Sequence, residues 1–188
     1  MPNDIFQKDT KAVAKELLGM SLVHETKEGK TVGKIVETEA YLQRDPGSHS
    51  HKGMTPRNAQ MFGKAGTAYV YFIYGMYHCF NIVTNKEGIG EAVLIRALQP
   101  VNGIELMKKR RKTDDIRNLC SGPGKLVIAM GITKHHNGAD LLTGTIRLLP
   151  RKKNKKIDIV TCTRVGISIG KELPYRFYIK NNPFISKP

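Results

Sequence analysis

Two glutamates stand two residues apart in the segment IVETEAY, which covers residues 35–41. On a β-strand successive side chains point to opposite faces, so Glu37, Glu39 and Tyr41 would share one face. These carboxylates have two interpretations. They are exposed and paired with surface cations, as most charged side chains are, or one of them lies in a pocket. In a pocket, burial would raise the carboxyl pKa toward the range that suits a general base.

An arginine stands in the middle of the apolar segment AVLIRALQP, residues 92–100. Arg96 in such a strand is either paired with a buried carboxylate or placed in a functional site. Glu37 and Glu39 are its most attractive partners by charge. The sequence leaves open which of the two it contacts.

Aromatic residues are dense in YVYFIYGMYHCF, residues 69–80. Such residues favour β-structure, so one interpretation is an ordinary sheet core with tyrosines at strand edges. In a basic chain without tryptophan, clustered tyrosines also suit stacking on nucleobases. The turn Tyr74-Gly75-Met76 has the size of a wedge that enters between base pairs. We therefore expect Tyr74 and Met76 to contact DNA.

Two histidines, His49 and His51, lie in the turn-rich segment PGSHSHKG. Histidine pairs can bind metal, but a tetrahedral site needs more ligands, and no CxxC or HExxH motif accompanies them. We expect neither a metal nor a cofactor. The remaining histidines are expected to have surface or structural roles; they are His24, His78, His135 and His136.

The elements that position these residues follow from hydrophobic periodicity and turn residues. Helices are predicted at 9–19 with Asp9 or Thr10 as N-cap, at 101–111, and from about Pro123 onward. Strands are predicted at 20–26, 31–41, in two runs joined around Tyr74-Gly75, at 91–100 closed by Pro100, and at 145–149, 157–162 and 175–179. Residues 43–66 are expected to be mostly loop.

These elements predict a single α+β domain over residues 1–188. Its sheet should be curved, mainly antiparallel and open-barrel-like, flanked by helices, with a protruding β-hairpin. Residues 1–8 are polar and terminal, so they are expected to be poorly ordered.

The charge balance points to a polyanionic partner. The chain has 31 Lys and Arg against 16 Asp and Glu, a net charge of +15 and a pI near 9.8. Nucleic acid, anionic membrane and acidic protein all fit such a balance. The three cysteines form no close pair, and the chain has neither an apolar signal segment nor 18 consecutive apolar residues. These features predict reduced thiols and a cytoplasmic location.

Seven segments together resemble the alkyladenine (3-methyladenine) DNA glycosylase family, the mammalian-type N-methylpurine glycosylases that also occur in bacteria. They are IVETEAY, SHSHKGMTPRNAQMF, GTAYVYFIYGMYHCFNI, VLIRALQP, LCSGPGKL, TRVGI and PYRFYI. The match runs from about residue 9 to residue 186, and so many long, ordered strings are specific. The resemblance implies a monofunctional enzyme of base excision repair. It would flip an alkylated or deaminated purine, of the 3-methyladenine, hypoxanthine and ethenoadenine class, out of DNA and hydrolyse the N-glycosidic bond.

The resemblance also implies roles for individual residues. Glu39 matches the general base that activates the attacking water, and Arg96 matches an arginine that helps to hold this water. Tyr41 and His49 match a pair that stacks on one side of the flipped base, and Tyr71 matches the aromatic on its other side. His49 is assigned here, rather than its neighbour two residues on, from its place in Ser-His-Ser.

Three further residues are expected at the DNA. The resemblance implies that Asn81 limits which guanines fit the pocket and that Tyr74 fills the gap left in the duplex. Lys125 stands near the expected helix start in GPGKL, where it could meet a phosphate. We expect double-stranded DNA as the partner, a monomer, no membrane, and association with the nucleoid.

Two other function classes stay open on the residues alone. A non-catalytic nucleic-acid-binding module explains the charge and the tyrosines but gives no role to Glu39 and Arg96. A carbohydrate hydrolase would use Glu37 and Glu39 as its carboxylate pair, with Cα atoms roughly 6.6 Å apart along a strand. That class leaves the net charge unexplained.

Overall fold

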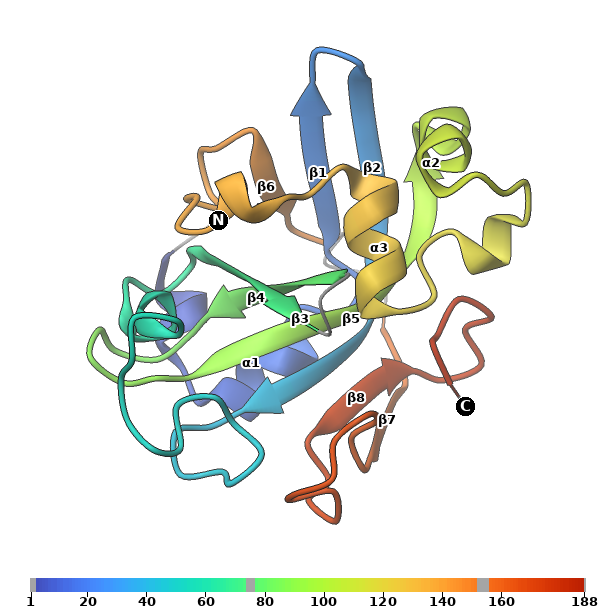
Figure 1. Ribbon diagram of the computed structural model, residues 1–188. Helices are drawn as coiled ribbons and strands as arrows, with labels where there is room; N and C mark the ends of the chain where they lie inside the picture. The colour runs from blue at the N-terminus through green and yellow to red at the C-terminus, as the bar shows by residue number, and fades with distance from the viewer. Residues whose placement is uncertain (1–2, 74–76, 152–155, 188) are drawn as a thin grey trace.

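The long strand β2 (Gly29–Tyr41) organises the fold of the computed structural model, which describes residues 3–73, 77–151 and 156–187 (Figure 1). Strand β5 (Ala92–Asn102) pairs along one edge of β2. Strand β1 (Ser21–Thr26) pairs with the first half of the other edge, and β8 (Arg176–Ile179) pairs with the second half. Because its partner changes along this edge, the sheet curls around β2.

All pairings between these strands are antiparallel, and the sheet order is β3-β4-β5-β2-β1-β6, with β7 paired to β8. The remaining strands are β3 (Ala68–Ile73), β4 (Tyr77–Val83), β6 (Ile146–Leu149) and β7 (Ile159–Cys162). The predicted α+β class with a curved, mainly antiparallel, open-barrel-like sheet is confirmed.

Three α-helices flank the described part of this sheet: α1 (Thr10–Glu16), α2 (Ile104–Arg111) and α3 (Pro123–Met130). Asp9 caps α1 by accepting hydrogen bonds from the backbone N–H groups of Lys11 and Ala12, as its position predicts. Proline opens α3 at the position where its missing N–H costs nothing. Short 3-10 turns complete the chain: η1 (Asn3–Gln7), η2 (Ala59–Phe62), η3 (Ile116–Asn118) and η4 (Lys134–His136).

Two expectations about the ends of elements differ from the structure. Strand β5 continues through Pro100, which pairs with Gly33 next to a register shift. A proline is tolerated there because a bulge does not require its missing N–H. The first residues that the structure describes form η1 rather than a poorly ordered tail, because Phe6 is fully buried in the hydrophobic core.

Strand β2 is buried on both faces. Helix α1 covers one face, and the Thr38 hydroxyl donates a 2.9 Å hydrogen bond to the carbonyl of Ala14. The opposite face carries Glu37 and Glu39. The register of β2 against β5 shifts on either side of Glu37, which is the irregularity of a β-bulge. Bulges redirect side chains and are frequent beside active sites.

Candidate active site

Strands β2 and β5 bring the two glutamates and the arginine together. In the register, Glu39 lies opposite Leu94 and Glu37 lies opposite Ala97, which places Arg96 between the two carboxylates. The Nε atom of Arg96 is 3.2 Å from Oε1 of Glu37, and Nη1 is 3.4 Å from Oε1 of Glu39. The sequence left open which glutamate contacts Arg96, and in the structure both do.

Both carboxylates are fully buried, with 0% of either residue exposed. The alternative of a solvated strand edge is therefore wrong. Burial raises the pKa of Glu39, while the positive charge of Arg96 and two hydrogen bonds oppose this effect. A buried carboxylate with a raised pKa and a cationic neighbour is the arrangement that suits a general base.

The carboxylate of Glu39 is held by three partners. Its Oε1 atom accepts a 2.8 Å hydrogen bond from the backbone N–H of Val165, and Oε2 accepts a 2.9 Å bond from the Tyr41 hydroxyl. Burial, and then the nearby negative charge of Glu39, raise the pKa of Tyr41, so its hydroxyl stays protonated as the donor. Arg96 completes the set and also donates from Nη1 to the Val165 carbonyl at 3.0 Å.

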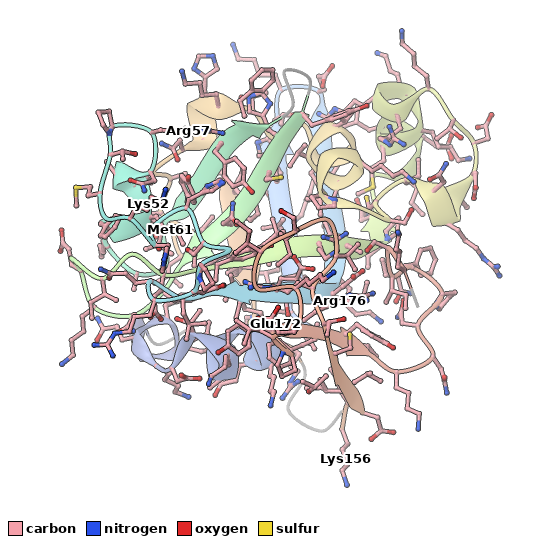
Figure 2. The ribbon with its side chains drawn as sticks, turned by 60° about the horizontal axis from the view of Figure 1, so that its bottom comes forward. Lys52, Arg57, Met61, Lys156, Glu172 and Arg176 are labelled. Atoms are coloured by element: carbon pink, nitrogen blue, oxygen red, sulfur yellow. The ribbon has the colours of Figure 1, made fainter. Side chains whose placement is uncertain are left out.

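A cavity of about 360 Å³ adjoins these groups. Tyr41, Arg96 and Val165 are part of its wall, whereas Glu39 lies directly behind them. Segments that follow β2 and β7 contribute to it. Figure 2 labels one of the lining residues, Met61, which belongs to η2. The remaining lining residues are Gly47, His49, Tyr69, Tyr71, Tyr77, Cys79, Asn81, Leu94, Pro123, Gly124, Gly166 and Ile167.

The aromatic residues of the cavity are grouped differently from the expectation. His49 contacts Tyr71, with ring centroids 4.5 Å apart and an interplanar angle of 71°. No base can stack between two rings in direct contact, because each stacked layer needs roughly the 3.5–4.0 Å of a van der Waals contact. The assignment of His49 to the side of Tyr41, opposite Tyr71, is therefore wrong for this structure.

Tyr69 explains the position of His49. Its hydroxyl lies 3.1 Å from Nδ1 of His49, and burial raises the pKa of Tyr69 to about 12. Burial, followed by the charge of Arg57, lowers the pKa of His49, which favours a neutral imidazole. Sequence analysis placed Tyr69 in the aromatic segment without giving it a role.

Asn81 lies on the floor of the same cavity. It is buried, and its amide nitrogen donates a 3.0 Å hydrogen bond to the carbonyl of Tyr69 across the β3–β4 pair. This bond fixes the plane of the amide. Asn81 therefore lines the cavity next to Leu94 on β5.

The residues predicted to contact DNA are only partly described. Tyr74 and Met76 lie outside the described residues, between β3 and β4. Lys125 stands in the first turn of α3, directly after the cavity-lining Pro123 and Gly124. Its ammonium group contacts Oδ1 of Asn118 and lies 3.5 Å from the Ser121 hydroxyl, so it is tethered and half-buried.

Sequence reasoning missed a buried ion pair behind the cavity. Arg164 contacts Asp45 through both terminal nitrogens, and both side chains are almost completely buried. The guanidinium carbon lies 4.7 Å from the centroid of the Tyr41 ring. The segment TRVGI, which contains Arg164 and Val165, carried the family resemblance, but nothing in it indicates a partner 119 residues earlier in the chain.

The structure gives two further results about the described residues. No group of three His, Cys, Asp or Glu side chains in that part of the chain could hold a metal ion. No helix within the described ranges is long and apolar enough to cross a membrane. His24, expected to be structural, is buried with its Nδ1 atom 2.7 Å from the Met130 carbonyl.

The chain is similar to known proteins over nearly its whole length. The family model described as methylpurine-DNA glycosylase matches residues 4–183. A relative from the archaeon Methanoculleus marisnigri is 50% identical over 190 residues, covering 100% of this chain and 98% of the relative. Relatives from Francisella tularensis and Carboxydothermus hydrogenoformans are also 50% identical, over 97% and 100% of this chain and 96% and 98% of their own lengths. All three are provisionally named 3-methyladenine DNA glycosylase. The chain therefore belongs to the methylpurine-DNA glycosylase family, and it is a DNA glycosylase.

Proposed function

We propose that the protein is a monofunctional glycosylase that flips alkylated or deaminated purines out of double-stranded DNA and hydrolyses their N-glycosidic bonds. Its substrates are lesions of the 3-methyladenine, hypoxanthine and ethenoadenine class. One observation carries the proposal: the buried carboxylate of Glu39 lies beside Arg96, directly behind the wall of an aromatic cavity. No metal or cofactor takes part in the reaction.

The cavity suits a single flipped base. Its volume of about 360 Å³ is at the lower end of the range for small-molecule pockets. We propose that the base stacks between Tyr41 on one side and the contacting pair His49 and Tyr71 on the other. Alkylation of a ring nitrogen makes a purine cationic, and a cationic ring binds well to the electron-rich faces of tyrosines. Asn81 on the floor restricts which purine edges fit.

Glu39 and Arg96 activate the attacking water. Nη2 of Arg96 takes part in none of the hydrogen bonds found among the described residues, and Arg96 lines the cavity. We propose that this nitrogen holds water next to Glu39. Because Glu39 has no exposed surface, water reaches its carboxylate after a small displacement of Tyr41 or Val165. The negative carboxylate also stabilises an oxocarbenium-like deoxyribose.

The described residues that line the cavity do not include a lysine. A bifunctional enzyme needs an amine there to form a Schiff base with the sugar. Water as nucleophile leaves an abasic site in an unbroken strand. This supports a monofunctional reaction, and borohydride should therefore trap no covalent protein–DNA adduct.

The DNA is held by charge and by the region around the cavity. A net charge of +15 favours binding to phosphates and makes the affinity depend on salt. We propose that Lys125 and the N-terminal turn of α3 meet a phosphate beside the cavity mouth. Tyr74 and Met76, on the segment between β3 and β4, would fill the space that the flipped nucleotide leaves.

The carbohydrate hydrolase is disfavoured by the surroundings of Glu37. Its carboxylate is held by contacts from Arg96, Arg176 and Ser186. These contacts hold the Glu37 carboxylate away from the position that the second catalytic carboxylate of a pair needs. The non-catalytic binding module leaves the buried Glu39–Arg96 pair without a purpose.

The test is base release from duplex oligonucleotides with one hypoxanthine or one ethenoadenine, and from alkylated DNA, revealed by alkaline cleavage at the abasic site. We expect release by the wild type. Glu39→Gln should lose at least about 10²-fold in rate with DNA binding retained. Release from alkylated DNA alone would remove hypoxanthine and ethenoadenine from the substrate class. Tight binding without release from any substrate would favour the non-catalytic module.

A further inference from the structure

Glu37 is a second buried carboxylate beside the cavity, and its acceptor positions are occupied by protein groups. Its Oε1 atom contacts Nε of Arg96 at 3.2 Å, Nε of Arg176 at 2.7 Å and the hydroxyl of Ser186 at 2.9 Å. Its Oε2 atom accepts a 2.5 Å hydrogen bond from the backbone N–H of Ser186. This carboxylate is fully buried and held by four contacts, so we expect it to act through its partners.

The partner that reaches the cavity is Arg96. Its Nε atom faces Glu37 and also donates to the Ser186 hydroxyl at 3.1 Å. Its Nη1 atom faces Val165 and Glu39. A guanidinium is a rigid plane, so fixing Nε and Nη1 also fixes the direction of Nη2. The contacts with Glu37 and Ser186 therefore determine the direction in which Nη2 points.

Ser186 comes from the last residues of the chain. Strand β8 places Arg176 next to Glu37, and Nη2 of Arg176 contacts the carbonyl of Lys187 (Figure 2 labels Arg176). Two residues after β8, Ser186 and Lys187, are thus bound to Glu37 and to Arg176 in one network behind the site. Arg176 also balances the charge of the second carboxylate, so two arginines face two glutamates.

From this geometry we propose that Glu37 and Ser186 form a positioning pair for the known reaction. They hold Arg96 in the orientation in which Nη2 presents water to Glu39, and so make the C-terminal segment part of the catalytic centre. The inference rests on the proposed function of Glu39 and Arg96. Neither Glu37 nor Ser186 touches the substrate. Replacing them should therefore change the rate of base release and leave the DNA affinity unchanged.

The decisive readouts are single-turnover rates across pH, with the concentration of enzyme varied. Glu37→Gln should lower the maximal rate of base release on the order of 10–100-fold, because a misplaced catalytic group costs about that much. The enzyme concentration at half-saturation should stay within twofold of the wild type.

The acidic limb of the rate profile gives an independent signature. Glu39 is faced by Arg96 on β5, by Tyr41 and Glu37 on β2, and by the N–H of Val165. Of these, the charge of Glu37 is one that raises the pKa of Glu39. Glu37→Gln removes this charge but also releases Arg96, whose charge is the larger and opposite influence on that pKa. The acidic limb should therefore move to higher pH while the maximal rate falls. If Glu37 does not position Arg96, the loss of its charge alone would move the limb to lower pH.

Ser186 variants keep the proposal testable where Glu37→Gln leaves Arg176 uncompensated and prevents folding. Ser186→Ala removes the hydroxyl between Arg96 and Glu37 but leaves both charges. We expect a several-fold lower maximal rate, an unchanged acidic limb, and recovery in Ser186→Thr, which retains the hydroxyl. The matched control is Glu25→Gln, which removes a surface glutamate paired with Arg147, and it should behave as wild type.

The outcomes separate this inference from the function on which it rests. A wild type without base release overturns the proposed function. An active wild type with unchanged rates and pH profiles in both Glu37→Gln and Ser186→Ala overturns the positioning pair. Loss of DNA affinity in Ser186→Ala at an unchanged maximal rate would overturn it as well.

Discussion

The hydroxyl of Tyr41 donates a 2.9 Å hydrogen bond to the carboxylate of Glu39, two residues earlier on the same strand. The ring of Tyr41 forms part of the cavity wall, and the guanidinium of Arg164 lies 4.7 Å from its centroid. One tyrosine thus joins the surface on which a base would stack to the group that would activate water. Because β2 alternates its faces, this link follows from the spacing of the two residues.

Removing this hydroxyl should change the pH profile of the enzyme. The hydrogen bond from Tyr41 lowers the pKa of Glu39, in opposition to burial. Tyr41→Phe keeps the ring and loses the bond, so the pKa of Glu39 should rise. Glu39 must be deprotonated to act as the general base, so the acidic limb of the rate of base release should move to higher pH. Below this limb, Tyr41→Phe should release the base several-fold more slowly than the wild type. An acidic limb at the wild-type position would contradict this link.

Glu39 should reduce the stability of the folded protein at neutral pH. Its folded pKa is raised, so its favourable contribution is present below the unfolded pKa and is lost as the pH rises through the folded value. Glu39→Gln carries no charge and should have the higher Tm at pH 7. A gain of about 1 kcal/mol would appear as roughly 2–4 °C for a chain of this size. Thermal unfolding of both proteins at acidic and neutral pH measures this, and the difference should shrink toward low pH.

The Arg164–Asp45 pair should be critical for folding. Both side chains are buried, and Arg164 also donates to the carbonyls of Ala40 and Gly170. Asp45→Asn leaves a buried guanidinium without its counter-charge, which should cost about 3–5 kcal/mol. Urea unfolding measures this loss. Glu28→Gln, which removes the exposed partner of Arg110, serves as the control and should leave the urea midpoint unchanged. A wild-type midpoint for Asp45→Asn would show that the Arg164–Asp45 pair does not stabilise the fold.

Lys125 should contribute one phosphate contact. Lys125→Ala should weaken DNA binding about equally for damaged and undamaged duplexes and reduce the salt slope of log K by about 1. Lys27→Ala at the exposed turn between β1 and β2 is the matched control and should retain the wild-type slope. Titrations at several salt concentrations distinguish the two. If Lys125 serves only to bind Asn118, its variant will lose stability while the slope stays the same.

The local elements could be predicted because their signals are local. Asp9 caps α1, Pro123 opens α3, and the alternation in β2 places Glu37, Glu39 and Tyr41 on one face. Each of these results depends on residues within a few positions of one another. The end of β5 was predicted less well. The sequence indicates a strand end at Pro100, but the strand continues through this proline beside a register shift.

By itself, therefore, the sequence determined most of the elements and the family resemblance, and the resemblance implied roles for Glu39 and Arg96. The tertiary structure decided their surroundings. It joins Glu39 to Val165 across 126 residues and Glu37 to Ser186 across 149, and it sets His49 against Tyr71. No local pattern encodes such contacts, since they form when separate loops and the C-terminal segment pack over one strand face. Burial of the carboxylates, and hence the raised pKa of Glu39, exists only after that packing.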